Sequence, residues 1–77
     1  MTDAYVHIIA EPSAISPAAE EIAGVPSVEA VHLVTGEHDL VARLDLDSKD
    51  DVARVVTEEI HAVNGIVDTV THVAFEP

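Results

Sequence analysis

Gly24 and Gly65 occupy corresponding positions in the two halves of the chain, which have the same order of segments. In each half, a run of residues typical of a β-strand precedes a stretch with helical spacing, a glycine and a second strand-like run. Glycine directly after a helical stretch is a common helix terminator, so both helices are predicted to end at these positions. The repeated order strand, helix, strand predicts a βαββαβ chain, which is the ferredoxin-like split βαβ fold of the α+β class.

Four runs rich in valine, isoleucine and leucine are predicted to form the strands. They span residues 4–10, 28–34, 40–46 and 66–75. The third run alternates apolar residues with Val41, Arg43 and Asp45, as expected of a strand that is buried on one face. A break that contains Gly36 separates it from the second run, so these two strands should form a hairpin. Right-handed crossovers then place both helices on one face of a four-stranded antiparallel sheet.

Both predicted helices have recognisable starts. Ser13 or Ser16 can cap the first helix, with Pro17 at its first position. Ser48 can cap the second helix, and the aspartates that follow it suit the positive end of the helix dipole. Apolar residues recur at helical spacing along the second helix and should face the core: Val52, Val55, Val56, Ile60 and Val63.

The face of the sheet that carries no helix is predicted to be apolar. The first and last strands have apolar residues in both registers, and the second strand has Val28, Ala30 and Val34 in one register and Val31 and Leu33 in the other. A domain of this size buries only about 60% of its unfolded surface, and the chain has no cysteine to form a stabilising disulfide. We therefore expect a homodimer formed through the uncovered sheet faces.

The charge of the chain excludes several classes of partner. The 77 residues include 15 Asp and Glu but only 3 Lys and Arg, which gives a formal net charge of −12. Binding to nucleic acid or to an anionic membrane depends on Lys and Arg, so direct contact with either is not expected. No apolar run approaches the roughly 20 residues needed to span a bilayer, and the N-terminus lacks the basic region of a signal peptide. We expect a cytoplasmic protein with a single domain over residues 1–77.

The most concentrated group of polar residues lies in the predicted hairpin connection, Thr35, Gly36, Glu37, His38 and Asp39. These residues can simply form a solvated turn, because Gly and Asp are turn formers. Alternatively, Gly36 lets a ligand approach the backbone while Asp39 faces the ammonium group of a small zwitterion. On the last strand, Thr69 and Thr71 share one face, which reflects either ordinary β-propensity or two hydroxyls directed at the same ligand.

Five histidines are a large number for so short a chain, and His7, His32 and His72 fall in the middle of predicted strands. No pair of them has the close spacing typical of metal ligands, so interface or core positions are favoured and no metal site is predicted. The chain has no cysteine nucleophile, no G-x-S-x-G motif and no phosphate-binding loop. We predict no catalytic residue and no cofactor.

These segments together resemble a known family. Residues 24–28, 34–41, 55–60 and 64–71 are similar to the effector-binding domain of the Lrp/AsnC transcription regulators, called RAM for regulation of amino-acid metabolism. The T-G-x-x-D-L hairpin and the G-V/I-x-x-T-x-T last strand carry the resemblance, which extends over essentially the whole chain.

The resemblance implies a non-catalytic module that binds an amino acid or similar effector, dimerises through its sheet and assembles further into rings such as octamers. The family's ligand loop falls on Thr35, Gly36, Glu37, His38 and Asp39, and its hydroxyl strand on Thr69 and Thr71. Asp39 and the neighbouring backbone would hold the amino-acid head group, while Glu37 and His38 would tune the choice of side chain. Full-length members also carry a helix-turn-helix domain, which this sequence lacks, so DNA contact would come from a paralogue in a mixed oligomer.

The acidity of the chain exceeds that of a typical family member. It is characteristic of halophilic cytoplasmic proteins, so we expect a haloarchaeal source.

Two alternative functions remain open. The same topology is also used by small dimeric α+β-barrel enzymes of the monooxygenase or isomerase type, in which a strand histidine such as His7 or His72 acts as the base. A third reading is an assembly domain that has lost ligand binding.

Overall fold

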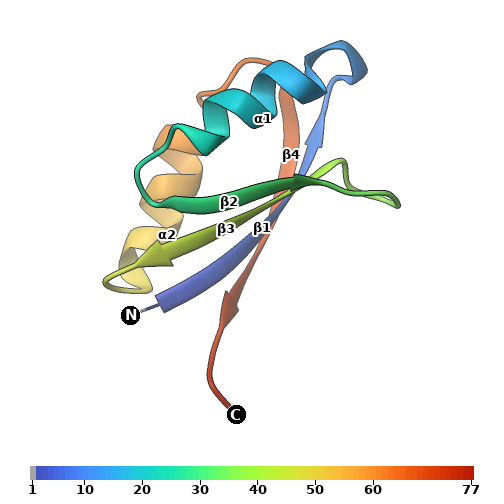
Figure 1. The fold of residues 1–77 in the computed structure, drawn as a ribbon. Coiled ribbons are helices and arrows are strands. Elements are labelled where there is room, and N and C mark those ends of the chain that lie inside the picture. The colour runs from blue at the N-terminus through green and yellow to red at the C-terminus, as the bar shows by residue number, and fades with distance from the viewer. Residues whose placement is uncertain (1) are drawn as a thin grey trace.

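The computed structural model describes residues 2–77 and has the predicted βαββαβ order (Figure 1). The strands are β1 (Thr2–Ala10), β2 (Val28–Leu33), β3 (Leu40–Leu46) and β4 (Ile66–Ala74). The helices are α1 (Ile15–Ala23), preceded by a 3₁₀ turn (Pro12–Ala14), and α2 (Asp50–Val55), which continues into a π-helical turn (Val56–Ile60). Within residues 2–77, none of the helices has the length and apolar character needed to cross a membrane.

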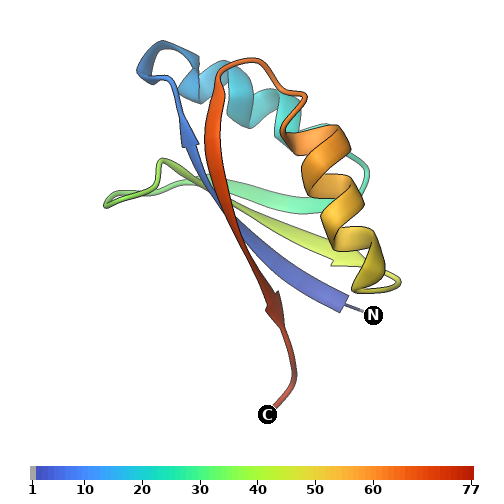
Figure 2. The ribbon, with the colours of Figure 1, turned by 180° about the vertical axis from the view of Figure 1, so that it is seen from behind.

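The four strands form one antiparallel sheet in the order β2-β3-β1-β4. Figures 1 and 2 show both helices on the same side of this sheet, with the C-terminal end of the chain extending away from them. The predicted ferredoxin-like fold, a four-stranded antiparallel sheet with two helices on one face, is confirmed.

The core lies between the sheet and the helices. Every second residue of β1 and β3 is buried there, and the strict alternation predicted for 40–46 is confirmed. The predicted apolar stripe of the second helix, Val52, Val55, Val56, Ile60 and Val63, is also buried. The largest fully buried side chains are those of Ile8, Ile22, Leu40, Leu44, Ile60, Val6 and Val55.

The uncovered side of the sheet, called here the helix-free face, is less apolar than predicted. The strand registers assign to it Asp3, Tyr5, His7 and Ile9 of β1, Ala30 and His32 of β2, Val41, Arg43 and Asp45 of β3, and Asp68, Val70, His72 and Ala74 of β4. A bulge between Val28 and Ala30 accounts for part of the difference. It turns both Val28 and Val31 toward the core, where they lie opposite Leu44 and Ala42, so β2 contributes little apolar surface to this face.

The helix starts were predicted with mixed success. The N-cap of the second helix is Lys49, which makes no side-chain cap, rather than the predicted Ser48. The hydroxyl of Ser48, one residue earlier, does accept a hydrogen bond of 3.1 Å from the N–H of Asp50. The first helix begins at Ile15, without a side-chain cap from Ser13 or Ser16, and Pro17 is its third residue rather than its first. This position is tolerated because the first four N–H groups of a helix have no partner within the helix.

Candidate functional site

The loop between β2 and β3 is held in place by hydrogen bonds at its base. The N–H of Val34 donates to the carbonyl of Asp39, and the N–H of Asp39 donates to the carbonyl of Ile8, both at 2.9 Å. At the loop tip, Gly36 has a φ of +114°, a conformation that favours glycine, and no other group lies within 4 Å of the position a Cβ would occupy. The tip therefore leaves its backbone open to solvent while its base is fixed to β1.

Asp39 is the most firmly positioned side chain of this loop. Its Oδ2 accepts a hydrogen bond of 3.0 Å from the N–H of Ala10 in a partly buried position. Together with the backbone bond to Ile8, this contact extends the β1–β3 pairing by one step beyond the ladder. Asp39 thus has a structural role that the sequence did not indicate, and its Oδ1 is free of hydrogen bonds among the described residues.

Thr69 and Thr71 lie on the core side of β4, opposite Ile8 and Val6, so they share one face, as predicted. Both side chains are half-buried. The Thr69 hydroxyl forms a hydrogen bond of 2.8 Å with Nε2 of His61, which closes the end of the second helix onto the sheet. Thr71 lines an open groove of about 380 Å³ between α2 and β4, together with Lys49, Val52, Ala53, Val56, Thr57 and Val73.

The seven predicted ligand residues therefore form two groups: the loop residues and Thr69 lie at one end of the sheet, and Thr71 lies apart from them. Asp39 and Thr69 approach Ile8 from opposite edges of β1, which places the loop and Thr69 at the same end of the sheet, about two strand spacings or 10 Å apart. Thr71 lies two residues farther along β4 and faces the groove under α2. Thr35, Gly36 and Glu37 are exposed at the loop tip, and His38 is half-buried beside β1.

A cluster of three imidazoles lies on the helix-free face. The ring centroid of His7 is 5.2 Å from that of His72 and 5.5 Å from that of His38, both in edge-to-face orientation. Burial lowers the pKa of His7, and the charges of His38 and His72 lower it further. Sequence reasoning missed this cluster because it joins a loop histidine to two strand histidines, and strand periodicity says nothing about where a loop side chain lies.

The positions of the histidines argue against the enzyme alternative. A strand histidine acting as a base would have to point into a pocket between the sheet and the helices, but His7 and His72 lie on the opposite face. Two grooves that described residues form on the helix side, of about 420 and 380 Å³, have no histidine in their walls. Among residues 2–77, no three His, Asp or Glu side chains are arranged as ligands of a metal ion.

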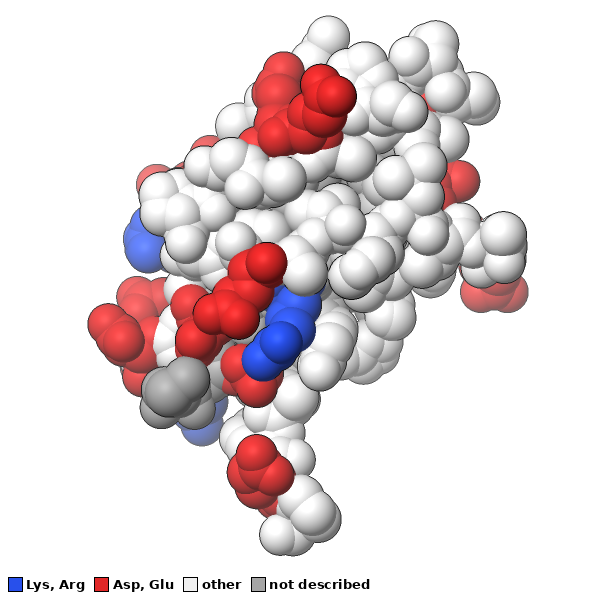
Figure 3. Space-filling model, viewed as in Figure 1, with Lys and Arg blue, Asp and Glu red and all other residues white. Residues whose placement is uncertain are grey.

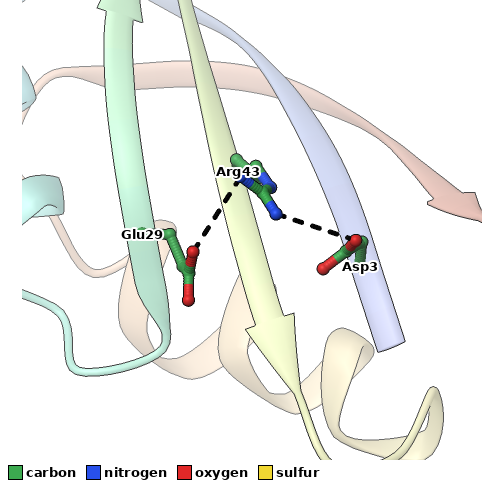
Figure 4. Close-up of polar contacts among 3 residues, drawn as sticks. All are labelled: Asp3, Glu29 and Arg43. Carbon is green, nitrogen blue, oxygen red and sulfur yellow. Dashed lines mark ion pairs between the residues drawn. The ribbon is translucent and has the colours of Figure 1, made fainter. Parts of the chain in front are cut away.

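Most charged side chains on the surface are acidic, and few basic side chains accompany them. Figure 3 shows acidic side chains spread over one view of the molecule, with few basic side chains among them. Arg43 lies between Asp3 and Glu29 on the helix-free face, with nitrogen–oxygen distances of 3.8 and 3.9 Å (Figure 4). These exposed pairs contribute little to stability. They do neutralise Arg43, so this side chain offers no free cation for a phosphate group.

A family model described as the Lrp/AsnC ligand binding domain matches residues 3–77. An uncharacterized HTH-type transcriptional regulator of Pyrococcus horikoshii is 39% identical over 57 residues, which are 74% of this chain and 38% of that protein. The chain thus spans about two fifths of the length of this relative.

Solved structures with the same fold include TTHA0845 from Thermus thermophilus, with a TM-score of 0.94 and 35% identity over 100% of this chain and 96% of that chain. A transcriptional regulator of Neisseria meningitidis in complex with L-Met has a TM-score of 0.86 at 16% identity, over 97% of this chain and 50% of that one. The second likeness is one of fold.

Proposed function

The chain belongs to the Lrp/AsnC ligand-binding domain family, and from this premise we propose that it is a stand-alone module that binds an amino acid and regulates transcription through the proteins it assembles with. The family is one of regulatory domains, and the chain is not an enzyme. The stand-alone form is supported by its similarity to TTHA0845, a solved chain of nearly the same extent. DNA contact then belongs to a paralogue with a helix-turn-helix domain in a mixed oligomer.

The observation that carries the ligand proposal is the position of Asp39. Its hydrogen bond to Ala10 fixes the carboxylate at the base of the β2–β3 loop while Oδ1 stays available to an ammonium group. The exposed backbone around Gly36 provides N–H groups for a carboxylate, and Thr69 supplies a hydroxyl at the same end of the sheet. An amino acid presents both charged groups, and L-Met is the ligand named for the Neisseria regulator of the same fold.

Assembly is the second part of the proposal. Tyr5 and Val70 are 40% and 41% exposed on the helix-free face, next to the apolar side chains of Ile9, Val41 and Ala74. Pairing two copies through this face covers these side chains. Their burial stabilises a domain that is too small to bury much apolar surface alone. Rings of such dimers, up to an octamer, are proposed to bring the β2–β3 loops to the contacts between neighbouring dimers, where Glu37 and His38 would meet the ligand side chain.

Calorimetric titration of the twenty amino acids into the wild type tests the ligand site. We expect one or a few to bind, and Asp39→Asn to weaken that binding by about 10- to 100-fold, as for the loss of a hydrogen bond to a charged group. Glu20→Gln is the control, because it removes one negative charge at an exposed position of α1, outside the proposed site. It should change the affinity by less than about threefold. Equal losses in the two variants, or no binding by the wild type, would contradict the proposal.

The halophilic character that we propose for this chain has a thermal test. At a net charge of −12, self-repulsion in the folded state is screened as the Debye length falls from about 10 Å at 0.1 M to about 3 Å at 1 M salt. We expect the Tm to rise by at least about 5 °C between 0.1 and 2 M KCl at constant protein concentration, which corresponds to about 1 kcal/mol for a domain of this size. A Tm that stays level or falls would count against adaptation to salt.

A further inference from the structure

The imidazole cluster of His7, His38 and His72 occupies the face through which the protein is proposed to dimerise. We propose that this cluster makes self-association sensitive to pH, with dimers stable at neutral pH and weakened as the pH falls toward about 5.5. The inference rests on the proposed dimer and concerns its regulation.

Among the described residues, the surroundings of His7 offer it no partner that would stabilise a positive charge. On the neighbouring strands, it lies directly opposite Val41 of β3 and Val70 of β4. Its aromatic contacts among the described residues are the rings of His38 and His72, whose charges lower the pKa of His7.

The remaining charged groups of this face are committed elsewhere or lie farther along the strands. Asp3 and Glu29 flank Arg43, and Asp45 lies opposite Asp3, beyond Tyr5 as seen from His7. On β4, Asp68 lies opposite Ile9 and accepts a hydrogen bond from the N–H of Thr69. On the loop, Oδ2 of Asp39 accepts a hydrogen bond from the N–H of Ala10, and His32 of β2 lies opposite Val41.

The direction of the effect follows from the lowered pKa of His7. Above its ordinary pKa, His7 is neutral in the folded and unfolded chains alike and does not affect stability. As the pH falls through the ordinary value, the unfolded chain takes up a proton that the folded chain resists, so stability is lost. Covering His7 with a second copy removes more water from it, which disfavours the charged form further, and a symmetric dimer repeats the cluster in both copies.

The charge of the whole molecule predicts the opposite trend, and this difference makes the inference testable. Protonating histidines lowers the net negative charge, so mutual repulsion of two acidic copies falls and association should strengthen. Carboxylates with ordinary pKa values remain ionised above about pH 5.5, so histidine is the side chain that titrates in this interval. Weaker association at lower pH therefore reports a local effect of the imidazoles.

Sedimentation equilibrium of the full chain in 1 M KCl with EDTA, at steps between about pH 7.5 and 5.5, measures the effect. We expect the dissociation constant of the wild-type dimer to rise at least about 10-fold over this interval, and by less than about threefold in the triple variant His7→Gln, His38→Gln, His72→Gln. The single variant His72→Gln, at an exposed position on the edge strand, gives an intermediate slope if the triple variant does not fold. His61→Gln is the matched control, because it removes a histidine off this face and should keep the wild-type profile.

The outcomes separate this inference from the proposal on which it rests. A wild-type dimer with a level or opposite pH profile overturns the inference and leaves the dimer intact. The same slope in the wild type and the His72→Gln variant also overturns it, since the titrating groups then lie elsewhere. A wild type that is monomeric at about pH 7.5 removes the proposed dimer, and the pH dependence with it.

Discussion

Replacing Gly65 with alanine is expected to destabilise the fold by about 2–5 kcal/mol, from about 1–2 kcal/mol of backbone strain and about 1–3 kcal/mol of overpacking. The φ of Gly65 is +93°, in the region that side chains rarely adopt, and an added Cβ would overlap the Cβ of Ala14. The carbonyl of Gly65 also accepts a hydrogen bond of 2.8 Å from the N–H of Glu11. The turn into β4 is thereby tied to the turn that follows β1, so it cannot move aside to make room.

Two companion variants separate the strain from the overlap. Gly36→Ala has a similar φ but open space around the new Cβ, so it should cost only the strain, about 1–2 kcal/mol. Combining Gly65→Ala with Ala14→Gly removes the overlap and should recover part of the loss. Urea unfolding at one protein concentration measures all three, because the stability of an associating protein depends on concentration. If Gly65→Ala lowers the free energy of unfolding no more than Gly36→Ala does, the residues around Ala14 can move to accommodate the new Cβ without cost.

Much of the fold could be predicted from periodicity alone. The strand 40–46 was predicted with its observed bounds, because its alternation of apolar and polar residues reports burial on one face. The apolar stripe from Val52 to Val63 could likewise be predicted, even though the helix changes from α to π geometry at Val56. The bulge between Val28 and Ala30 could not be predicted, because an extra residue in a strand leaves no periodic signal. It reverses which of the following side chains face the core.

The candidate site was predicted only in part, for a related reason. Turn-forming and charged residues identified the loop 35–39, but the hydrogen bond from Ala10 to Asp39 joins residues 29 positions apart and depends on the register of β1 against β3. The contact between His7 and His38 depends on the same register. Composition can therefore indicate which residues are suited to a site, while the distances among them become available only once the strands are paired.

A negative charge placed at Val70 on the helix-free face is expected to dissociate the proposed dimer. Val70 is 41% exposed and lies on the edge strand opposite His7, so Val70→Asp should leave the fold of each protomer intact. In the proposed dimer, each copy would bury one unpaired carboxylate, at an effective penalty of several kcal/mol per ion. We expect the dissociation constant to rise at least about 100-fold, equivalent to about 2.8 kcal/mol.

Leu33→Asp is the control for this variant, because Leu33 is 61% exposed but lies opposite Leu40, in the register that faces the core side of the sheet. It introduces the same charge at an exposed apolar position away from the helix-free face and should leave the dimer unchanged. Light scattering and sedimentation are performed in 1 M KCl at about pH 8, above the ordinary pKa of histidine. The salt screens the net charge, so the comparison reports burial of the new carboxylate rather than repulsion between acidic copies. If Val70→Asp associates as tightly as the wild type, the two copies meet through another surface, and the exposed Tyr5 and Val70 serve some other contact.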